Sequence, residues 1–229
     1  MSIRKIMAIF QKTFKDMMKN KRTLLIFLIF PIMTVVMYNM ISDEKEFFST
    51  IFIPMHLILV PASIMASIIS EEKEKNTLRP LIMSNVKPLE YFLGIGIFVL
   101  IISIISSSLF LITMNLIVME LLRFYTIVTL SVICSMVIGA VIGIMADNQM
   151  NANAFIMPVS IILGIIPMFS AFNEIVKNIS SCLYTQTLAN VLNSISERIS
   201  LRDYVMIAAN FVICLIIFIL VYRKKKLDH

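Results

Sequence analysis

The chain has 229 residues and a formal net charge of +6 at pH 7. Hydrophobic residues make up 59% of it, charged residues only 15%, and the mean hydropathy is +0.92. A soluble globular domain of this composition would lack the polar residues to cover its core, so the composition argues for an integral membrane protein.

Six long apolar runs fill most of the chain. Each is close to the ~20 residues that a helix needs to cross about 30 Å of hydrocarbon. We therefore predict an all-α membrane protein with one transmembrane domain over residues 1–229. The expected spans are 24–41, 50–70, 92–117, 124–145, 154–171 and 204–221.

An amphipathic pattern precedes the first span. Apolar residues recur at helical spacing between Ile3 and Met18, and basic residues from Arg4 to Lys19 occupy the other positions. Residues 1–23 are therefore expected to form an elbow helix on the inner membrane surface, in contact with membrane lipids.

The basic residues lie mostly on one side of the spans. They concentrate before the first span, between the second and third, and after the last. This bias predicts cytoplasmic termini, and it explains the positive charge by topology, without a nucleic-acid partner. Cys134 and Cys214 fall within spans and Cys182 alone lies outside them, so no disulfide pair is expected on the outer face.

Gly139 and Gly143 are four residues apart in the fourth span, a spacing that favours close packing between membrane helices. Further along the chain, the apolar residues of 173–203 recur at helical spacing. We expect this segment to form two short amphipathic helices that lie on, or dip into, the outer leaflet.

The connection 71–91 is the most polar inner segment. Its charged part begins directly where the second span ends and is expected to continue that helix into the cytoplasm. After Pro80, an apolar stripe too short to span the membrane runs from Leu81 to Leu89. It predicts a short helix parallel to the membrane that is available to a partner protein.

The chain lacks the motifs of several enzyme classes. No Gly-rich phosphate loop is present, because all five glycines fall in membrane segments. The two histidines, His56 within a span and His229 at the end, cannot form a histidine zinc pair. No charged residue lies at mid-span, which argues against an ion-coupled transporter. We expect a non-catalytic chain without metal or cofactor, driven by another chain.

The stretch Glu72 to Leu78, E-K-E-K-N-T-L, resembles the signature that follows the second span of type 2 ABC exporter permeases. The resemblance continues through Leu81, Ser84, Pro88, Glu90 and Gly94. The family pattern approximates E-x-E-x-G-T-L, and this chain has Asn76 in place of the glycine. The elbow, the six spans and the outer helices before the last span match the same architecture.

This resemblance implies a bacterial cytoplasmic-membrane subunit that works with a separate ATPase, which would bind ATP and Mg²⁺. It implies a second permease subunit too, in a homodimer or a heterodimer. Subunits this compact resemble exporters of antimicrobial peptides, toxins or hydrophobic drugs. The residues that the resemblance assigns to ATPase coupling are Glu71, Glu72, Glu74, Thr77, Leu78, Leu81, Ser84 and Pro88.

Two further expectations concern the carboxylates and the cargo. Glu72 and Glu74 lie beyond the hydrocarbon, so we expect the folded spans not to depend on them. Met33, Met37 and Met40 share a face of the first span and could supply an adaptable lining for hydrophobic or amphipathic cargo, although a Met-rich membrane composition also produces such stripes. A non-transporting immunity or scaffold protein that binds a peptide, with no ATPase, is the alternative function.

Overall fold

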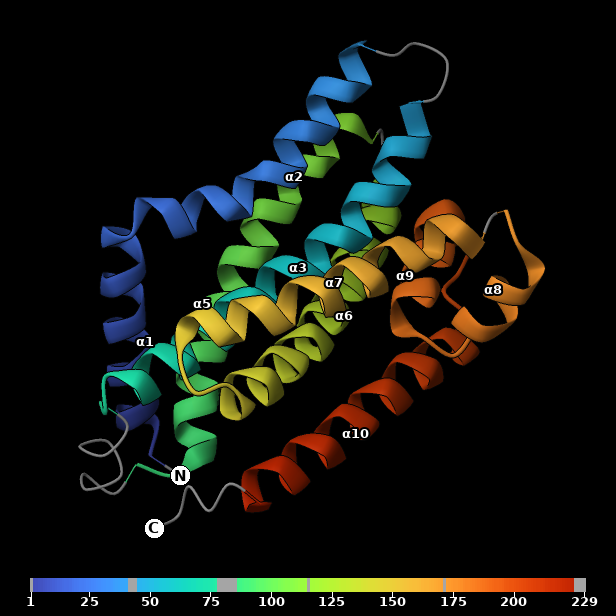
Figure 1. Ribbon diagram of the computed structural model, residues 1–229. Helices are drawn as coiled ribbons and strands as arrows, with labels where there is room; N and C mark the ends of the chain where they lie inside the picture. The colour runs from blue at the N-terminus through green and yellow to red at the C-terminus, as the bar shows by residue number, and fades with distance from the viewer. Residues whose placement is uncertain (1, 41–44, 78–85, 115, 171, 225–229) are drawn as a thin grey trace.

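The computed structural model describes residues 2–40, 45–77, 86–114, 116–170 and 172–224, and every regular element within them is a helix (Figure 1). The all-α prediction is confirmed. The helices are α1 (Ile3–Lys19), α2 (Lys21–Met40), α3 (Lys45–Glu74), α5 (Pro88–Ser107), η1 (Ser108–Thr113), α6 (Val118–Met145), α7 (Gln149–Ser170), α8 (Glu174–Ser180), α9 (Tyr184–Asn193) and α10 (Leu201–Lys224).

Among the described residues, five helical segments are long and apolar enough to cross a membrane. They lie in α3, α5 with η1, α6, α7 and α10. These five match the second to sixth expected spans. The first expected span corresponds to α2, whose apolar helical part Phe27–Met40 is shorter.

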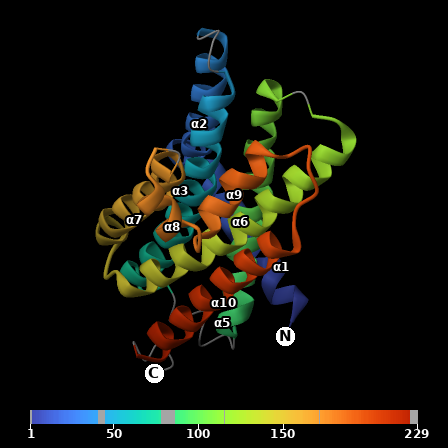
Figure 2. The ribbon, with the colours of Figure 1, turned by 90° about the vertical axis from the view of Figure 1, so that its right-hand side faces the viewer.

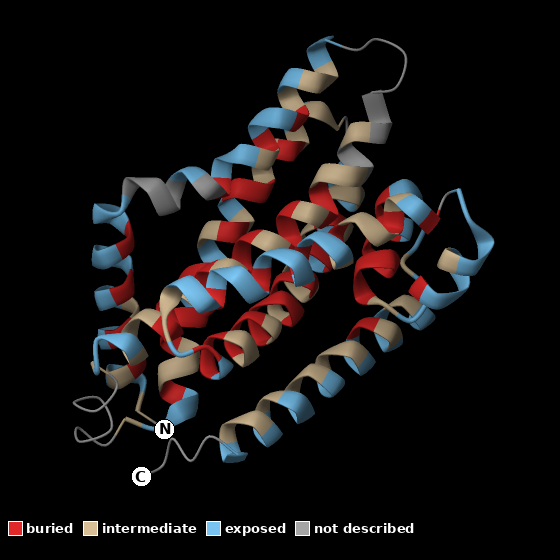
Figure 3. Ribbon diagram, in the orientation of Figure 1, coloured by how far each residue is buried: buried red, intermediate tan, exposed pale blue. Residues whose placement is uncertain are grey.

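The centre of the bundle is α3, which packs against α6, α7 and α2 (Figure 1). The most apolar windows of α3 and α6 are each 67% buried, compared with 6% for α10. Figure 3 shows the same contrast: buried residues concentrate in α3 and α6, whereas α10 is largely exposed. The position of α10 is set by α6 and α9, which it runs beside (Figures 1 and 2).

Small residues let α3 and α6 approach closely. A Cβ atom built on Gly139 would lie 2.2 Å from the carbonyl oxygen of Ala62, and one on Gly143 would lie 3.0 Å from that of Ala66. Both helices therefore carry small residues four apart at the contact, which confirms the packing role predicted for the two glycines.

Several helices extend beyond the expected spans. The helix α5 begins at Pro88, because proline suits a first helical position and the backbone N–H of Lys87 donates to Glu90 Oε2 at 3.1 Å. Pro88 to Tyr91, which the sequence pattern places in the connection 71–91, thus belong to a helix that is long and apolar enough to cross a membrane. At its other end α5 continues directly as the 3₁₀ helix η1.

The segment between α7 and α10 forms two short helices that pack differently from each other. Helix α8 leaves Ile175 and Ile179 exposed, as a helix against lipid would. Helix α9 is instead mostly buried, in contact with α3, α6, α7 and α10. Its Tyr184 hydroxyl lies 2.9 Å from Ser135 Oγ of α6, so α9 is bonded into the bundle.

Candidate coupling site

The C-terminal end of α3 is closed by a backbone motif. Asn76 adopts a left-handed conformation with φ 53°. The N–H of Thr77 donates to the carbonyl of Glu72 at 2.9 Å, and that of Asn76 donates to the carbonyl of Lys73 at 3.1 Å. These are the two bonds of a Schellman ending, in which glycine is the usual left-handed residue and asparagine the next choice. The structure therefore explains why Asn can replace the glycine of the family pattern.

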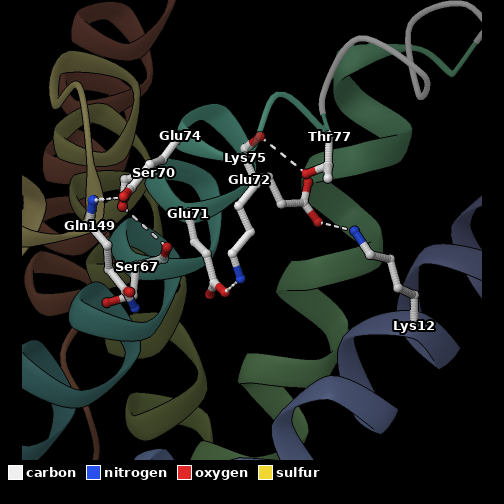
Figure 4. A network of polar contacts seen from close by, with 9 residues as sticks. All are labelled: Lys12, Ser67, Ser70, Glu71, Glu72, Glu74, Lys75, Thr77 and Gln149. Atoms are coloured by element: carbon white, nitrogen blue, oxygen red, sulfur yellow. Dashed lines mark hydrogen bonds and ion pairs between the residues drawn. The ribbon is translucent and has the colours of Figure 1, made fainter.

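The three glutamates at this end have three different partners (Figure 4). Glu71 pairs with Lys75, one turn further along and just past the end of α3, and this hydrogen bond raises the pKa of Lys75. Because the pair is local and exposed to water, it contributes little to the fold.

Glu72 forms an ion pair with Lys12 of α1, the elbow helix (Figure 4). The Glu72 side chain is only 12% exposed and that of Lys12 is 42% exposed. A partly buried ion pair of this kind is shielded from water better than the Glu71 pair. It ties the elbow helix to the end of the central helix α3.

Glu74 and its neighbour Lys73 reach the connection between α6 and α7. Glu74 Oε2 accepts a hydrogen bond from the backbone N–H of Gln149, the first residue of α7, at 3.0 Å (Figure 4). Lys73 Nζ donates to the carbonyls of Ile144 at 2.9 Å and Ala146 at 2.5 Å, at the end of α6.

These contacts correct one expectation from the sequence. We expected the folded spans not to depend on Glu72 and Glu74, but each binds another helix of the same chain. The reason is that the last turn of α3 lies beside α1, the C-terminal end of α6 and the N-terminal end of α7.

The elbow helix α1 is also fastened to α5. The backbone N–H of Ser2 donates to Glu90 Oε1 at 2.5 Å. A Cβ on Gly94 would lie 2.6 Å from Cβ of Ile9, so only glycine lets the two helices approach this closely. The ring of Phe98 packs edge-on against Phe10 and Phe14. The elbow helix therefore touches both helices that flank the connection 78–87.

The structure brings part of the predicted coupling set together. Glu71, Glu72, Glu74 and Thr77 lie at the end of α3, and Pro88 begins α5. Leu78, Leu81 and Ser84 lie outside the described residues. Sequence reasoning did not assign a role in this site to Lys12, Lys73 or Gln149, because nothing in a linear pattern pairs residues so far apart in the chain.

The methionines of α2 are accessible. Met33 and Met40 are 39% and 73% exposed, and Met37 is half-buried. Elsewhere, His56 is buried between the rings of Phe30 and Phe110, with Nε2 2.9 Å from Ser106 Oγ, as a packed histidine. In the described part of the chain, no three His, Cys, Asp or Glu side chains gather as metal ligands would.

The comparison with known families agrees with this architecture. The family described as "ABC-2 family transporter protein" matches residues 44–223, from the residue before α3 to near the end of α10. No curated relative matches the chain. The match covers most of the chain, and membership implies association with an ABC ATPase subunit. The chain therefore belongs to the ABC-2 transporter family and is a membrane permease subunit of an ABC transporter.

Proposed function

We propose that the chain is the permease of an ATP-driven bacterial exporter, and that a separate ATPase acts on the segment after α3. The chain itself is non-catalytic: ATP and Mg²⁺ bind on the ATPase, and two permease subunits, identical or similar, enclose the path. Both termini face the cytoplasm, where the ATPase works.

The arrangement at the end of α3 carries this proposal. The connection 78–87 joins α3 to α5, and α3 ends in direct contact with α1, α6 and α7. A force applied to that connection would reach five helices through named contacts. An ATPase docked there could therefore move much of the bundle without touching most of it.

The test is purification of the tagged chain from its native membranes in mild detergent. We expect an ABC ATPase to copurify, phosphate release by the complex, and no release by the permease alone. Native mass spectrometry of the same sample counts the permease copies and is expected to show two per complex. A wild-type chain that is folded and carries no ATPase would contradict the proposal.

We assign the cargo to hydrophobic or amphipathic molecules. The accessible methionines of α2 support this, because an unbranched thioether side chain adapts to varied apolar shapes. The test replaces Met33, Met37 and Met40 together by Ala and measures cargo-stimulated phosphate release with a panel of amphipathic peptides. Cargo stimulation should weaken in this variant. The control is Met150→Ala near the start of α7, where the Met150 side chain is 80% exposed, and it should leave the stimulation unchanged. Equal responses in both variants would contradict the lining role.

A further inference from the structure

Lys73 and Glu74 are adjacent in sequence, carry opposite charges and bind opposite helix ends. Lys73 binds carbonyls at the C-terminal end of α6, and Glu74 binds the first backbone N–H of α7. A helix carries partial negative charge at its C-terminus and partial positive charge at its N-terminus, so each side chain meets the end that its charge favours. We call this pair and the turn 146–148 that it holds the inner clamp.

Two other contacts join the same parts. Ser67 Oγ, about two turns before Glu74 on α3, donates to Asn153 Oδ1 of α7 at 3.0 Å (Figure 4 shows Ser67 near Gln149). The small buried residues Ala62, Ala66, Ala146 and Ala152 pack together beneath the clamp, with Ile156. Polar contacts at the surface and an apolar contact below them thus hold the turn and the start of α7 against α3.

We propose that Lys73 and Glu74 are positioning residues that make the turn 146–148 and the first turns of α7 move with the end of α3 as one body. This inference rests on the proposed function, because the motion comes from an ATPase acting after α3. The connection 78–87, on which the ATPase acts, is not next to α6 or α7 in the sequence. Through this pair, the motion of α3 would move both helices. Of the charged side chains from Glu71 to Glu74, Lys73 and Glu74 are the two that bind the ends of α6 and α7, and the Ser67 and alanine contacts support them.

The first test needs no ATPase. Hydrogen exchange is measured on the purified permease over residues 146–152. Lys73→Met removes both hydrogen bonds of the Lys73 ammonium group, and one hydrogen bond from a charged group already shifts a local opening equilibrium by about tenfold, so exchange there should speed up at least that much. Glu74→Gln should give a rise of roughly twofold to fivefold, as for a charge at an exposed helix end. Lys73→Arg should restore protection, and Glu71→Gln is the matched control, because the described partner of Glu71 is Lys75, one turn further along the chain.

Unchanged exchange in Lys73→Met would overturn the clamp. A rise of the same size in α10 would overturn it as well, because that pattern reports loss of the whole fold. Either result stands whether or not an ATPase partner exists, so it is separate from any failure of the proposed function.

The second test uses the complex with its copurified ATPase. Lys73→Met should leave ATPase binding and the KM for ATP unchanged, because neither the ATP site nor the connection 78–87 is altered. The kcat should fall severalfold, and Lys73→Arg should recover it. A purely structural role would reduce the amount of complex and leave its kcat intact, and that outcome would overturn the inference.

A cross-link checks the single-body motion directly. Ser67→Cys and Asn153→Cys are combined in a chain whose native cysteines are replaced by Ser, and a disulfide is formed with an oxidant in membrane vesicles. If α3 and the start of α7 move together, kcat should stay within about twofold of the reduced form. The control is Ser67→Cys alone with the same oxidant. A disulfide that stops hydrolysis, with a control that does not, would show that the two helices must separate.

Discussion

Replacing Gly139 by Ala should destabilise the bundle, although alanine is the better helix former. The new Cβ would lie 2.2 Å from the carbonyl oxygen and 2.7 Å from the Cα of Ala62. Both atoms belong to the backbone of α3 and cannot rotate away, so the helices must move apart. Overpacking of this kind costs about 1–3 kcal/mol, against a gain of about 1 kcal/mol for removing a helical glycine. Because the overlap is severe, we expect a net loss of roughly 2 kcal/mol.

Gly96→Ala is the matched control. A Cβ there would meet only Met136, at 3.6 Å, which is an ordinary contact. This substitution should leave stability unchanged or raise it by up to about 1 kcal/mol.

The assay follows the buried thiol of Cys134, which is 1% exposed, as it becomes reactive toward a fluorogenic maleimide on heating. Cys182 and Cys214 are replaced by Ser, so that Cys134 is the only thiol. At roughly 2–4 °C per kcal/mol, Gly139→Ala should lower Tm by about 4–8 °C. Equal or higher Tm in Gly139→Ala than in Gly96→Ala would refute the close contact between α3 and α6.

Three further predictions follow from the coupling site and the topology. Asn76→Gly should keep or raise Tm, whereas Asn76→Val should lower the free energy of unfolding by roughly 1–2 kcal/mol, because a branched residue is strained at φ 53°. Equal Tm values in the two variants would contradict the motif that ends α3. Glu72→Lys should lower the free energy of unfolding by about 1–3 kcal/mol in the same thermal assay, and adding Lys12→Glu should recover most of that loss. If the losses of the two single variants simply add in the double variant, the ion pair is contradicted. In a cysteine-free background, Lys87→Cys should react with a membrane-impermeant maleimide only from the cytoplasmic side and Lys177→Cys only from outside. Reaction of both from one side would contradict the six-span topology.

The features that the sequence predicted well are those that depend on local pattern. Apolar run length predicted the spanning helices, and the spacing of Gly139 and Gly143 predicted a close helix contact. The resemblance around Glu72 to Leu78 predicted the family, which the comparison confirms.

The features that it missed depend on tertiary placement. An amphipathic pattern is the same for a helix on a membrane surface and for one packed among spans, so the burial of α9 was not predictable. The partners of Glu72 and Glu74 lie 60 and 75 positions away in the chain, and no local rule pairs them. The sequence therefore indicated a candidate coupling region, but not that its charges bind neighbouring helices of the same chain.

The central claim is that an ATPase docks on the segment after α3. The most direct measurement places a photo-reactive amino acid at Thr77, the last described residue before that segment, and illuminates native membranes. The same amino acid at Lys177, on α8, is the control. We predict a covalent product between Thr77 and an ABC ATPase, identified by mass spectrometry, and none from Lys177. Cross-linking of the ATPase from Lys177 and not from Thr77 would contradict the account.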